Sequence, residues 1–303
     1  MTELSQTILR EYQVRKTKKQ KDRFIRLLQA HFPQLQIEST RFPKSRNLII
    51  GNLDTAKVLL SAHYDTCARL PFPNFITPKK PLISILYSLL IVLPAIALIF
   101  VFSTILGFFV KDFWVAYIIT LLMYGVIIWF MMAGPANKHN ANDNTSGVIT
   151  LLEIYDQLSD EAKEQVAFVF FDNEEKGVMG SGQFRHKYKN RIKDLLLINF
   201  DCVSDGDHFL FGVSKKANAK YHVGLARSYS STDTKHVMLE RLNKVYYPSD
   251  QAGFPVAVSV AALKYKKFPG YYMDRIHTKK DIVFDESNIA YLTQRTVQFV
   301  ESL

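Results

Sequence analysis

Two long apolar segments in the middle of the chain restrict its fold more than any other feature. Residues 82–110 and 113–133 contain no charged side chain, and only Lys111 and Asp112 separate them. Each segment is longer than the roughly 18–20 apolar residues that a helix needs to cross a bilayer. A buried hairpin in a soluble core is the alternative, but so many nearly uncharged residues are atypical of a soluble sheet protein. The sequence therefore predicts a transmembrane helical hairpin over residues 81–133.

Basic residues flank this hairpin on both sides. Lys79 and Lys80 precede the first segment, and Lys138 follows the second. Because lysine and arginine are enriched in cytoplasmic loops, we predict an integral membrane protein with two transmembrane helices and a cytoplasmic polar domain. The chain has only two cysteines, Cys67 and Cys202, which agrees with a reducing compartment.

The chain as a whole is basic, with a formal net charge of +10 and a pI of about 9.4. It contains no nucleic-acid-binding motif, so we expect no nucleic acid as a partner. We predict that the positive charge is attracted to the lipid bilayer. Residues 1–32 are predicted to be a basic helical segment with one apolar stripe. Two interpretations of its cations remain open, a solvated helix face or a contact with lipid headgroups; they are Arg15, Lys16, Lys18, Lys19 and Lys21.

Outside the hairpin, short apolar strands alternate with helical patterns. Strands are predicted at 47–51, 56–61, 166–171, 195–200 and 255–262, with an antiparallel edge strand at 209–213; helices are predicted at 148–158, 182–189, 217–228 and 285–301. Recurring strand–helix units predict an α/β fold with a mostly parallel, mixed sheet flanked by helices. The polar domain is then discontinuous, comprising residues 1–80 and 134–303.

The strand at 166–171 is followed directly by Asp172, Asn173, Glu174 and Glu175. Functional groups in open α/β sheets gather beyond the carboxyl ends of the strands. Two adjacent carboxylates repel each other there unless they share a cation or a proton. A solvated acidic loop is the alternative explanation for a lone pair of glutamates.

Other polar residues also follow predicted strands, and together they suit a metal site. The full set is His63, Asp65, Asp143, Glu174, Glu175, Asp201 and His277. Zinc takes nitrogen and oxygen ligands, and two zinc ions about 3.5–4 Å apart can share a carboxylate and hold a water between them. A further carboxylate is then needed to take the proton from that water. Singly, each residue has a structural explanation: Asp143 could cap a helix, and Asp201 could lie in a turn.

The sequence resembles the co-catalytic zinc aminopeptidases, which include bacterial leucyl aminopeptidases, aminopeptidase Y and glutamate carboxypeptidase-type enzymes. The matching segments extend along the whole polar domain in the family's order: SAHYDT (61–66), NDNTSG (142–147), FVFFDNEEKGVMGS (168–181), NFDCV (199–203), YYPSDQAGFP (246–255) and IHTKKD (276–281). The resemblance implies a zinc-peptidase-like fold and a hydrolase that acts on peptides, as an aminopeptidase with two Zn²⁺ per chain.

The resemblance also implies roles for individual residues. Asp143 would bridge the two metals, His63 and Asp201 would complete one site, and Glu175 and His277 would complete the other. Glu174 would be the general base, and Asp65 would orient His63.

The sequence departs from the family pattern at two places. Gln251 stands where the family often has histidine, which puts contacts on the substrate side in doubt. The hairpin is inserted between His63 and Asp143, where soluble members have a short loop. We therefore expect the active site to face the membrane and its substrates to be peptides at the cytoplasmic leaflet.

Two other functions are compatible with parts of the pattern. A glutaminyl-cyclase-like transferase shares the HYD and FFD-x-EE segments and uses one zinc. An inactive membrane scaffold on a peptidase fold is the other alternative, but such a chain is expected to lose ligands, whereas this one has all five.

Overall fold

The computed structural model describes residues 1–42 and 44–303. A nine-stranded mixed sheet lies at its centre, in the order β1-β2-β4-β3-β5-β8-β6-β7, with β9 paired to β8. The strands are β1 (Gln36–Ser39), β2 (Arg46–Ile50), β3 (Val58–His63), β4 (Val166–Phe171), β5 (Leu196–Phe200), β6 (His208–Val213), β7 (His236–Arg241), β8 (Ala257–Lys266) and β9 (Gly270–Tyr272). Its four central strands β4, β3, β5 and β8 are parallel, so their carboxyl ends meet at one edge.

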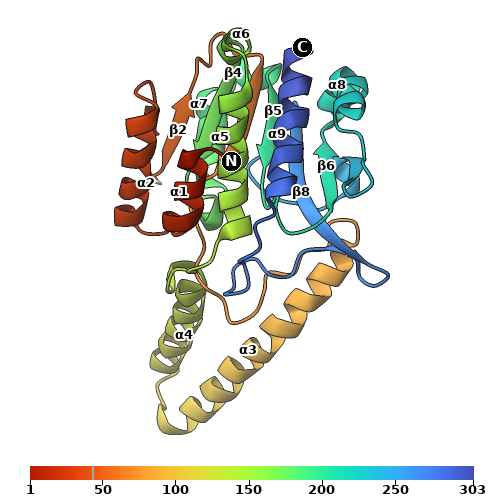
Figure 1. Ribbon diagram of the computed structural model, residues 1–303. Helices are drawn as coiled ribbons and strands as arrows, with labels where there is room; N and C mark the ends of the chain where they lie inside the picture. The colour runs from red at the N-terminus through yellow and green to blue at the C-terminus, as the bar shows by residue number, and fades with distance from the viewer. Residues whose placement is uncertain (43) are drawn as a thin grey trace.

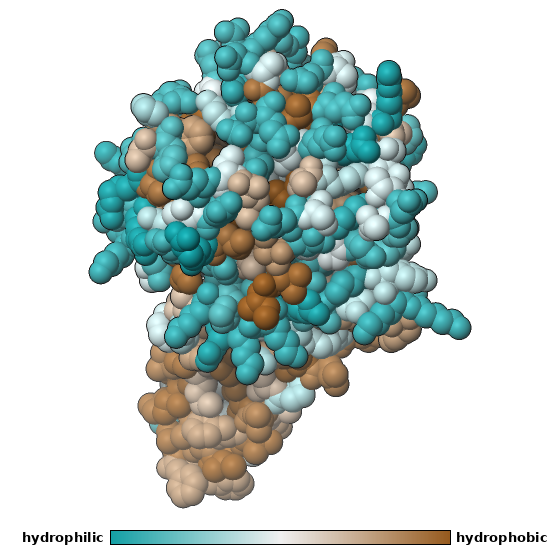
Figure 2. Space-filling view, viewed as in Figure 1, coloured by the Kyte–Doolittle hydropathy of each residue, from teal (hydrophilic) through white to brown (hydrophobic). Residues whose placement is uncertain are grey.

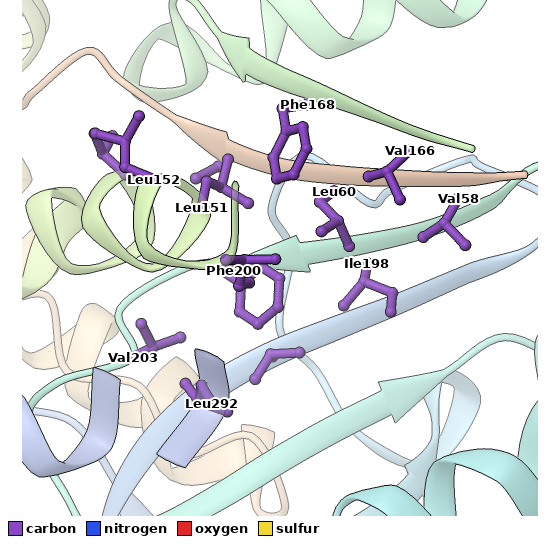
Figure 3. Close-up of a cluster of buried hydrophobic side chains, with 14 of the residues drawn as sticks. Val58, Leu60, Leu151, Leu152, Val166, Phe168, Ile198, Phe200, Val203 and Leu292 are labelled. Atoms are coloured by element: carbon purple, nitrogen blue, oxygen red, sulfur yellow. The ribbon is translucent and has the colours of Figure 1, made fainter. Parts of the chain in front are cut away.

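The side chains of the central strands alternate between the two faces of the sheet, so the apolar core has two parts. In β3, Val58 and Leu60 belong to one apolar cluster and Leu59 to another. Successive side chains of a strand point to opposite faces, and both faces here are apolar because both are covered. Figure 3 shows the larger cluster, in which residues of β3, β4 and β5 pack with Leu151, Leu152 and Leu292 of the covering helices.

Helices form a layer on each side of this sheet (Figure 1). The larger cluster joins the sheet to α1 (Glu3–Glu11), α2 (Lys18–His31), α5 (Gly147–Gln157), α8 (Lys215–Ser228) and α9 (Glu286–Glu301). Phe184 of α7 (Met179–Lys187) packs in the second cluster. Short elements complete the chain: α6 (Asp160–Glu164), η1 (Ala141–Ser146), η2 (Glu174–Lys176), η3 (Arg191–Lys193) and η4 (Leu242–Lys244). The α/β fold class predicted from the sequence is confirmed.

The two apolar segments are helices that project from the polar domain below the carboxyl edge of the sheet (Figure 1). They are α3 (Pro81–Phe109) and α4 (Phe113–Ala133), each long and apolar enough to cross a membrane. Only 6% of the most apolar window of α3 and none of that of α4 is buried. Apolar side chains therefore cover the surface of the hairpin, in contrast to the polar domain (Figure 2). Ser103 and Thr120 join the two helices by a hydrogen bond of 2.8 Å.

Several details differ from the sequence-based predictions. The N-terminal segment is two helices rather than one, because the chain leaves α1 at Tyr12 and restarts at Lys18 with a capping box from Thr17 and Gln20. Strand β6 is antiparallel to β8 as predicted, but it is not the edge, because β7 pairs with its other side.

Candidate metal centre

The predicted site residues meet at the carboxyl edge of the sheet. His63 is the last residue of β3, Asp201 directly follows β5, and Glu174 and Glu175 form η2 just beyond β4. Asp143 lies in η1, and His277 lies in the loop between β9 and α9. The parallel arrangement of β4, β3 and β5 is what brings residues so distant in sequence to one edge.

His63, Asp143 and Asp201 form a first group whose potential ligand atoms all lie within 4.8 Å of one another. The Nε2 atom of His63 lies 3.3 Å from Asp143 Oδ1 and 3.4 Å from Asp201 Oδ1. All three residues are buried.

A second group adjoins the first through the other oxygen of Asp143. The Nε2 atom of His277 lies 3.1 Å from Asp143 Oδ2 and 3.2 Å from Glu175 Oε2. Asp143 therefore directs one carboxylate oxygen to each imidazole, which is the arrangement expected of a carboxylate between two metal positions.

Cys67 also lies within ligand distance of Glu175 and His277, and the sequence analysis gave it no role. In the sequence, only its position two residues after Asp65 indicates that Cys67 lies near the site. Burial raises the pKa of the Cys67 thiol well above its usual value, and the thiol donates to Asn140 Oδ1 at 3.6 Å. Zinc binds the thiolate, so Cys67 would have to lose this proton to join Glu175 and His277 as a ligand.

The donor atoms present fit zinc. Buried oxygen atoms of Glu175 (Oε1) and Asp201 (Oδ1) make no hydrogen bond within the described residues. Buried polar atoms are rarely left unpaired, so these two are candidates for binding a cation. The Nδ1 atom of His63 faces the carbonyl oxygen of Asp65 at 3.1 Å, which leaves Nε2 to the metal position.

Asp65 contacts the site through its backbone carbonyl and through its carboxylate. The carboxylate lies 3.7 Å from His63 Nδ1, too far for a hydrogen bond, and the backbone carbonyl makes that contact instead. The carboxylate accepts the backbone N–H groups of Glu174 at 2.9 Å and Glu175 at 3.3 Å. Asn173 has a φ of 56°, a conformation that asparagine tolerates better than most residues, and the chain turns there between β4 and the two glutamates.

Protonation in this cluster is strongly perturbed. Burial opposes the charged imidazole of His277, but Glu175 and Asp143 outweigh it and raise the pKa to about 9. Burial raises the pKa of Glu175 to about 8. Burial and the neighbouring carboxylates also raise the pKa of Glu174 well above its usual value, although the charge of His63 opposes them. Perturbed pKa values of this kind are typical of functional sites.

Asp281 supports the loop that carries Asp143, a role that was not predicted although the residue lies in the matched segment 276–281. Its carboxylate accepts the backbone N–H of Asn142 at 2.9 Å and that of Asp143 at 3.1 Å. The side chain is 1% exposed, so these two bonds fix the position of Asp143 relative to His277.

The site opens into a cavity of about 80 Å³ whose outer wall includes Asn74, Ile76 and Tyr247. Asn74 and Ile76 belong to the segment that leads from β3 into α3, so the stem of the hairpin forms part of this wall. Gln251, the departure from the family pattern, does not line the cavity. It is buried, donates to the carbonyl of Tyr247 at 2.7 Å and accepts from Asn199 at 3.2 Å, so it braces the loop behind the site.

The fold and the arrangement of side chains are those of a metallopeptidase. Residues 129–299 match peptidase family M28, and this match covers more than half of the chain. The chain therefore belongs to peptidase family M28, whose zinc peptidases typically use two metal ions. This confirms the family resemblance found in the sequence.

Solved structures support the same fold. The LapA aminopeptidase of Legionella pneumophila aligns over 99% of this chain and 68% of its own, with 13% identity and a TM-score of 0.56. A glutaminyl cyclase of Porphyromonas gingivalis aligns over 99% of this chain and 96% of its own, with 16% identity and a TM-score of 0.56. At these identities the likeness establishes the fold alone. No curated protein sequence matches the chain.

Proposed function

We propose that the protein is a membrane-anchored metallopeptidase with two zinc ions, acting as an aminopeptidase on peptides near the cytoplasmic membrane face. One observation carries this proposal: the carboxylate of Asp143 lies between the imidazoles of His63 and His277, 3.3 Å and 3.1 Å away. A site for a single zinc ion would not need both the His63 and the His277 imidazole beside this carboxylate.

Five side chains would hold the metals. His63 and Asp201 would bind one zinc, Glu175 and His277 would bind the other, and Asp143 would bind both. When bound, the pair would polarise the scissile carbonyl and make the water between them acidic.

Glu174 lies outside this ligand set and is the best placed general base. Its backbone is fixed by Asp65, and its side chain lines the same cavity as the ligands. The Glu174 carboxylate would take a proton from the attacking water as the water oxygen bonds to the carbonyl carbon. It would then deliver that proton to the nitrogen of the breaking C–N bond.

The dimensions of the cavity support action at a peptide end. At about 80 Å³ it is much smaller than ordinary ligand pockets, which measure about 300–1,000 Å³. One terminal residue of an extended peptide fits such a space better than a folded chain does.

Membrane anchoring rests on the exposed apolar surface of α3 and α4, which contrasts with the mostly polar face of the rest of the chain in Figure 2. Lys79, Lys80 and Lys138 lie at the two ends of the hairpin and favour a cytoplasmic polar domain. Asn74 and Ile76, in the segment that leads into α3, line the cavity. Substrates would therefore reach the site at the membrane surface.

A test of this placement compares the full chain with a variant in which a Gly/Ser linker replaces residues 82–133. We expect the variant to be soluble without detergent, to keep its metals, and to lose activity selectively on bilayer-associated peptides. Equal rates of the two proteins on soluble and bilayer-associated peptides would contradict the proposed substrate class.

A glutaminyl-cyclase-like activity is the second candidate, because the Porphyromonas gingivalis cyclase aligns over 96% of its own chain. Metal analysis and product analysis distinguish the two. Two zinc ions per chain with cleavage of aminoacyl anilides support the peptidase; one zinc with cyclisation of N-terminal glutamine supports the cyclase.

The variant that tests the catalytic role is Glu174→Gln, with Glu164→Gln at an exposed position as its control. We expect the first to lose about 10²–10⁴-fold in kcat while it keeps both metals, and the second to be unchanged. An active Glu174→Gln protein would exclude Glu174 as the general base.

A further inference from the structure

A second cavity of about 230 Å³ lies beside η2, the turn that carries Glu174 and Glu175, and is lined mainly by lysine and arginine side chains. We call it the basic pocket; its cationic residues are Lys16, Lys18, Lys21, Lys44, Arg46 and Lys176. Three chain segments meet there: the start of α2, the segment that leads into β2, and η2.

The carboxylates in and around the basic pocket neutralise only part of this charge. Lys21 pairs with Asp172, while Arg46 pairs with Asp22 at 2.5 Å and Lys18 lies 3.8 Å from the same carboxylate. None of the ion pairs formed within residues 1–42 and 44–303 involves the remaining three cations, Lys16, Lys44 and Lys176. Burial and the charge of Lys176 both lower the pKa of Lys16, as expected where two cations face one cavity.

Hydrogen bonds hold the walls of the basic pocket in place. The side-chain amide of Asn173 donates to the carbonyl of Lys44 at 2.8 Å and to Ser45 Oγ at 3.1 Å. Lys21 in turn donates to Asn173 Oδ1 at 3.0 Å. The three segments are therefore joined by hydrogen bonds, and the three cations without a carboxylate partner are carried on a fixed frame.

Helix stability does not explain these lysines. The first turn of α2 begins with Lys18 and contains no acidic residue. Positive side chains near a helix N-terminus oppose the helix dipole, so this turn is unfavourable unless an anion lies nearby.

The basic pocket lies near the end of an apolar helix. Lys16 donates from its ammonium group to the carbonyl of Met132 at 2.7 Å, one residue before α4 ends. The pocket therefore lies level with the end of an apolar helix. In a helix that crosses a membrane, this is the level of the lipid phosphates. Phe42, in the same loop as Lys44, is 97% exposed, and an exposed aromatic beside cations is typical of a surface that lies in a membrane interface.

We propose that the basic pocket binds the phosphate of an anionic phospholipid headgroup through Lys16, Lys44 and Lys176. This inference rests on the membrane anchoring in the proposed function. Lys176 is the last residue of η2, so a bound headgroup would lie directly beside the turn that carries Glu174 and Glu175.

The test uses the full chain in non-ionic detergent, titrated separately with phosphatidylglycerol, phosphatidylcholine and inorganic phosphate, with bound species counted by native mass spectrometry. The pocket variant carries Lys16→Gln, Lys44→Gln and Lys176→Gln. Its matched control carries Lys189→Gln, Lys215→Gln and Lys216→Gln, which remove the same charge at exposed positions. Lys215 and Lys216 follow β6, which runs antiparallel to β8, so they lie at the opposite edge of the sheet.

We expect phosphatidylglycerol to bind in preference to phosphatidylcholine. The pocket variant should lose at least about tenfold in this affinity, because each lysine near an anionic lipid surface contributes to attraction, and the control variant should lose little. Equal loss in both variants, no preference for the anionic lipid, or inorganic phosphate that binds as tightly would each overturn the proposal. Zinc content, detergent requirement and anilide cleavage are measured on the same preparations, so a failure of the proposed function is detected separately.

Discussion

The carboxylate of Asp65 accepts a hydrogen bond of 2.9 Å from the backbone N–H of Glu174. This bond joins the end of β3, which carries His63, to the turn beyond β4, which carries the general base of the proposed reaction. Asp65 is thus a positioning residue for two parts of the site, the end of β3 and the turn beyond β4. Burial disfavours its charge, but Lys21 and His63 outweigh burial and lower its pKa.

Replacing Asp65 with asparagine should weaken catalysis without abolishing metal binding. The amide preserves the shape but loses the negative charge that holds the Glu174 and Glu175 N–H groups, so we expect kcat to fall about 10–100-fold, as for other residues that support metal ligands. The measurement is kcat and KM with metal content on the same sample. Asp54→Asn, at an exposed turn, is the control. An unchanged kcat would show that the turn is held by other contacts.

Loss of metal should depend on which ligand is removed. Asp143→Ala should abolish binding of both zinc ions, because each of its oxygens faces a different imidazole. His277→Ala should abolish one and leave the group of His63, Asp143 and Asp201 intact. Elemental analysis after dialysis measures this difference. Equal stoichiometry in the two variants would contradict the bridging position of Asp143.

Metal binding at pH 7 should release protons. Although burial opposes the charge, the carboxylates of Glu175 and Asp143 raise the pKa of His277 to about 9 without metal, so the imidazole holds a proton at pH 7. Zinc requires the neutral imidazole. Affinity should therefore rise as the pH increases from 7 to 9 and fall as the pH is lowered. Titration calorimetry in two buffers of different ionisation enthalpy measures the protons released, and His277→Ala should release fewer. An identical heat in both buffers would contradict this prediction.

Much of the fold and of the candidate site could be predicted because the signals are local. A run such as Val166–Phe171 specifies a buried strand by its composition, and the polar residues that follow β3, β4 and β5 reach one edge because those strands are parallel. Strands β1, β7 and β9 were not predicted. In β1 only Glu38 is buried, no residue of β7 is buried, and β9 has three residues, so none of them has the apolar run of a central strand.

Long-range contacts could not be predicted from the same signals. The sequence indicated a role for Asp65 in orienting His63, but only the structure shows that its carboxylate binds the backbone of η2. The basic run of the N-terminal segment was interpreted as one surface. The structure divides it, with Arg15 and Lys21 buried and Lys18 and Lys19 exposed, because the break between α1 and α2 turns Arg15 inwards.

Arg15 should consequently be important for stability. It is fully buried and donates to the carbonyls of Tyr64 and Tyr12 and to Thr145 Oγ1 at 3.1 Å. Burial lowers its pKa to about 10, while the charges of Asp65 and Asp143 oppose that shift, so it stays protonated at neutral pH.

Arg15→Met would leave these acceptors unpaired and remove the cation that offsets the two carboxylates. We expect a destabilisation of about 3–5 kcal/mol, the range for breaking a buried charge pair. Thermal unfolding of the full chain in detergent measures it, with Arg10→Met at a side chain that is 72% exposed as the control. Weaker zinc binding should accompany the lower midpoint, because Thr145 and Tyr64 lie within two residues of the proposed ligands Asp143 and His63 in the chain. Equal midpoints for the two variants would mean that the buried guanidinium contributes no net stability.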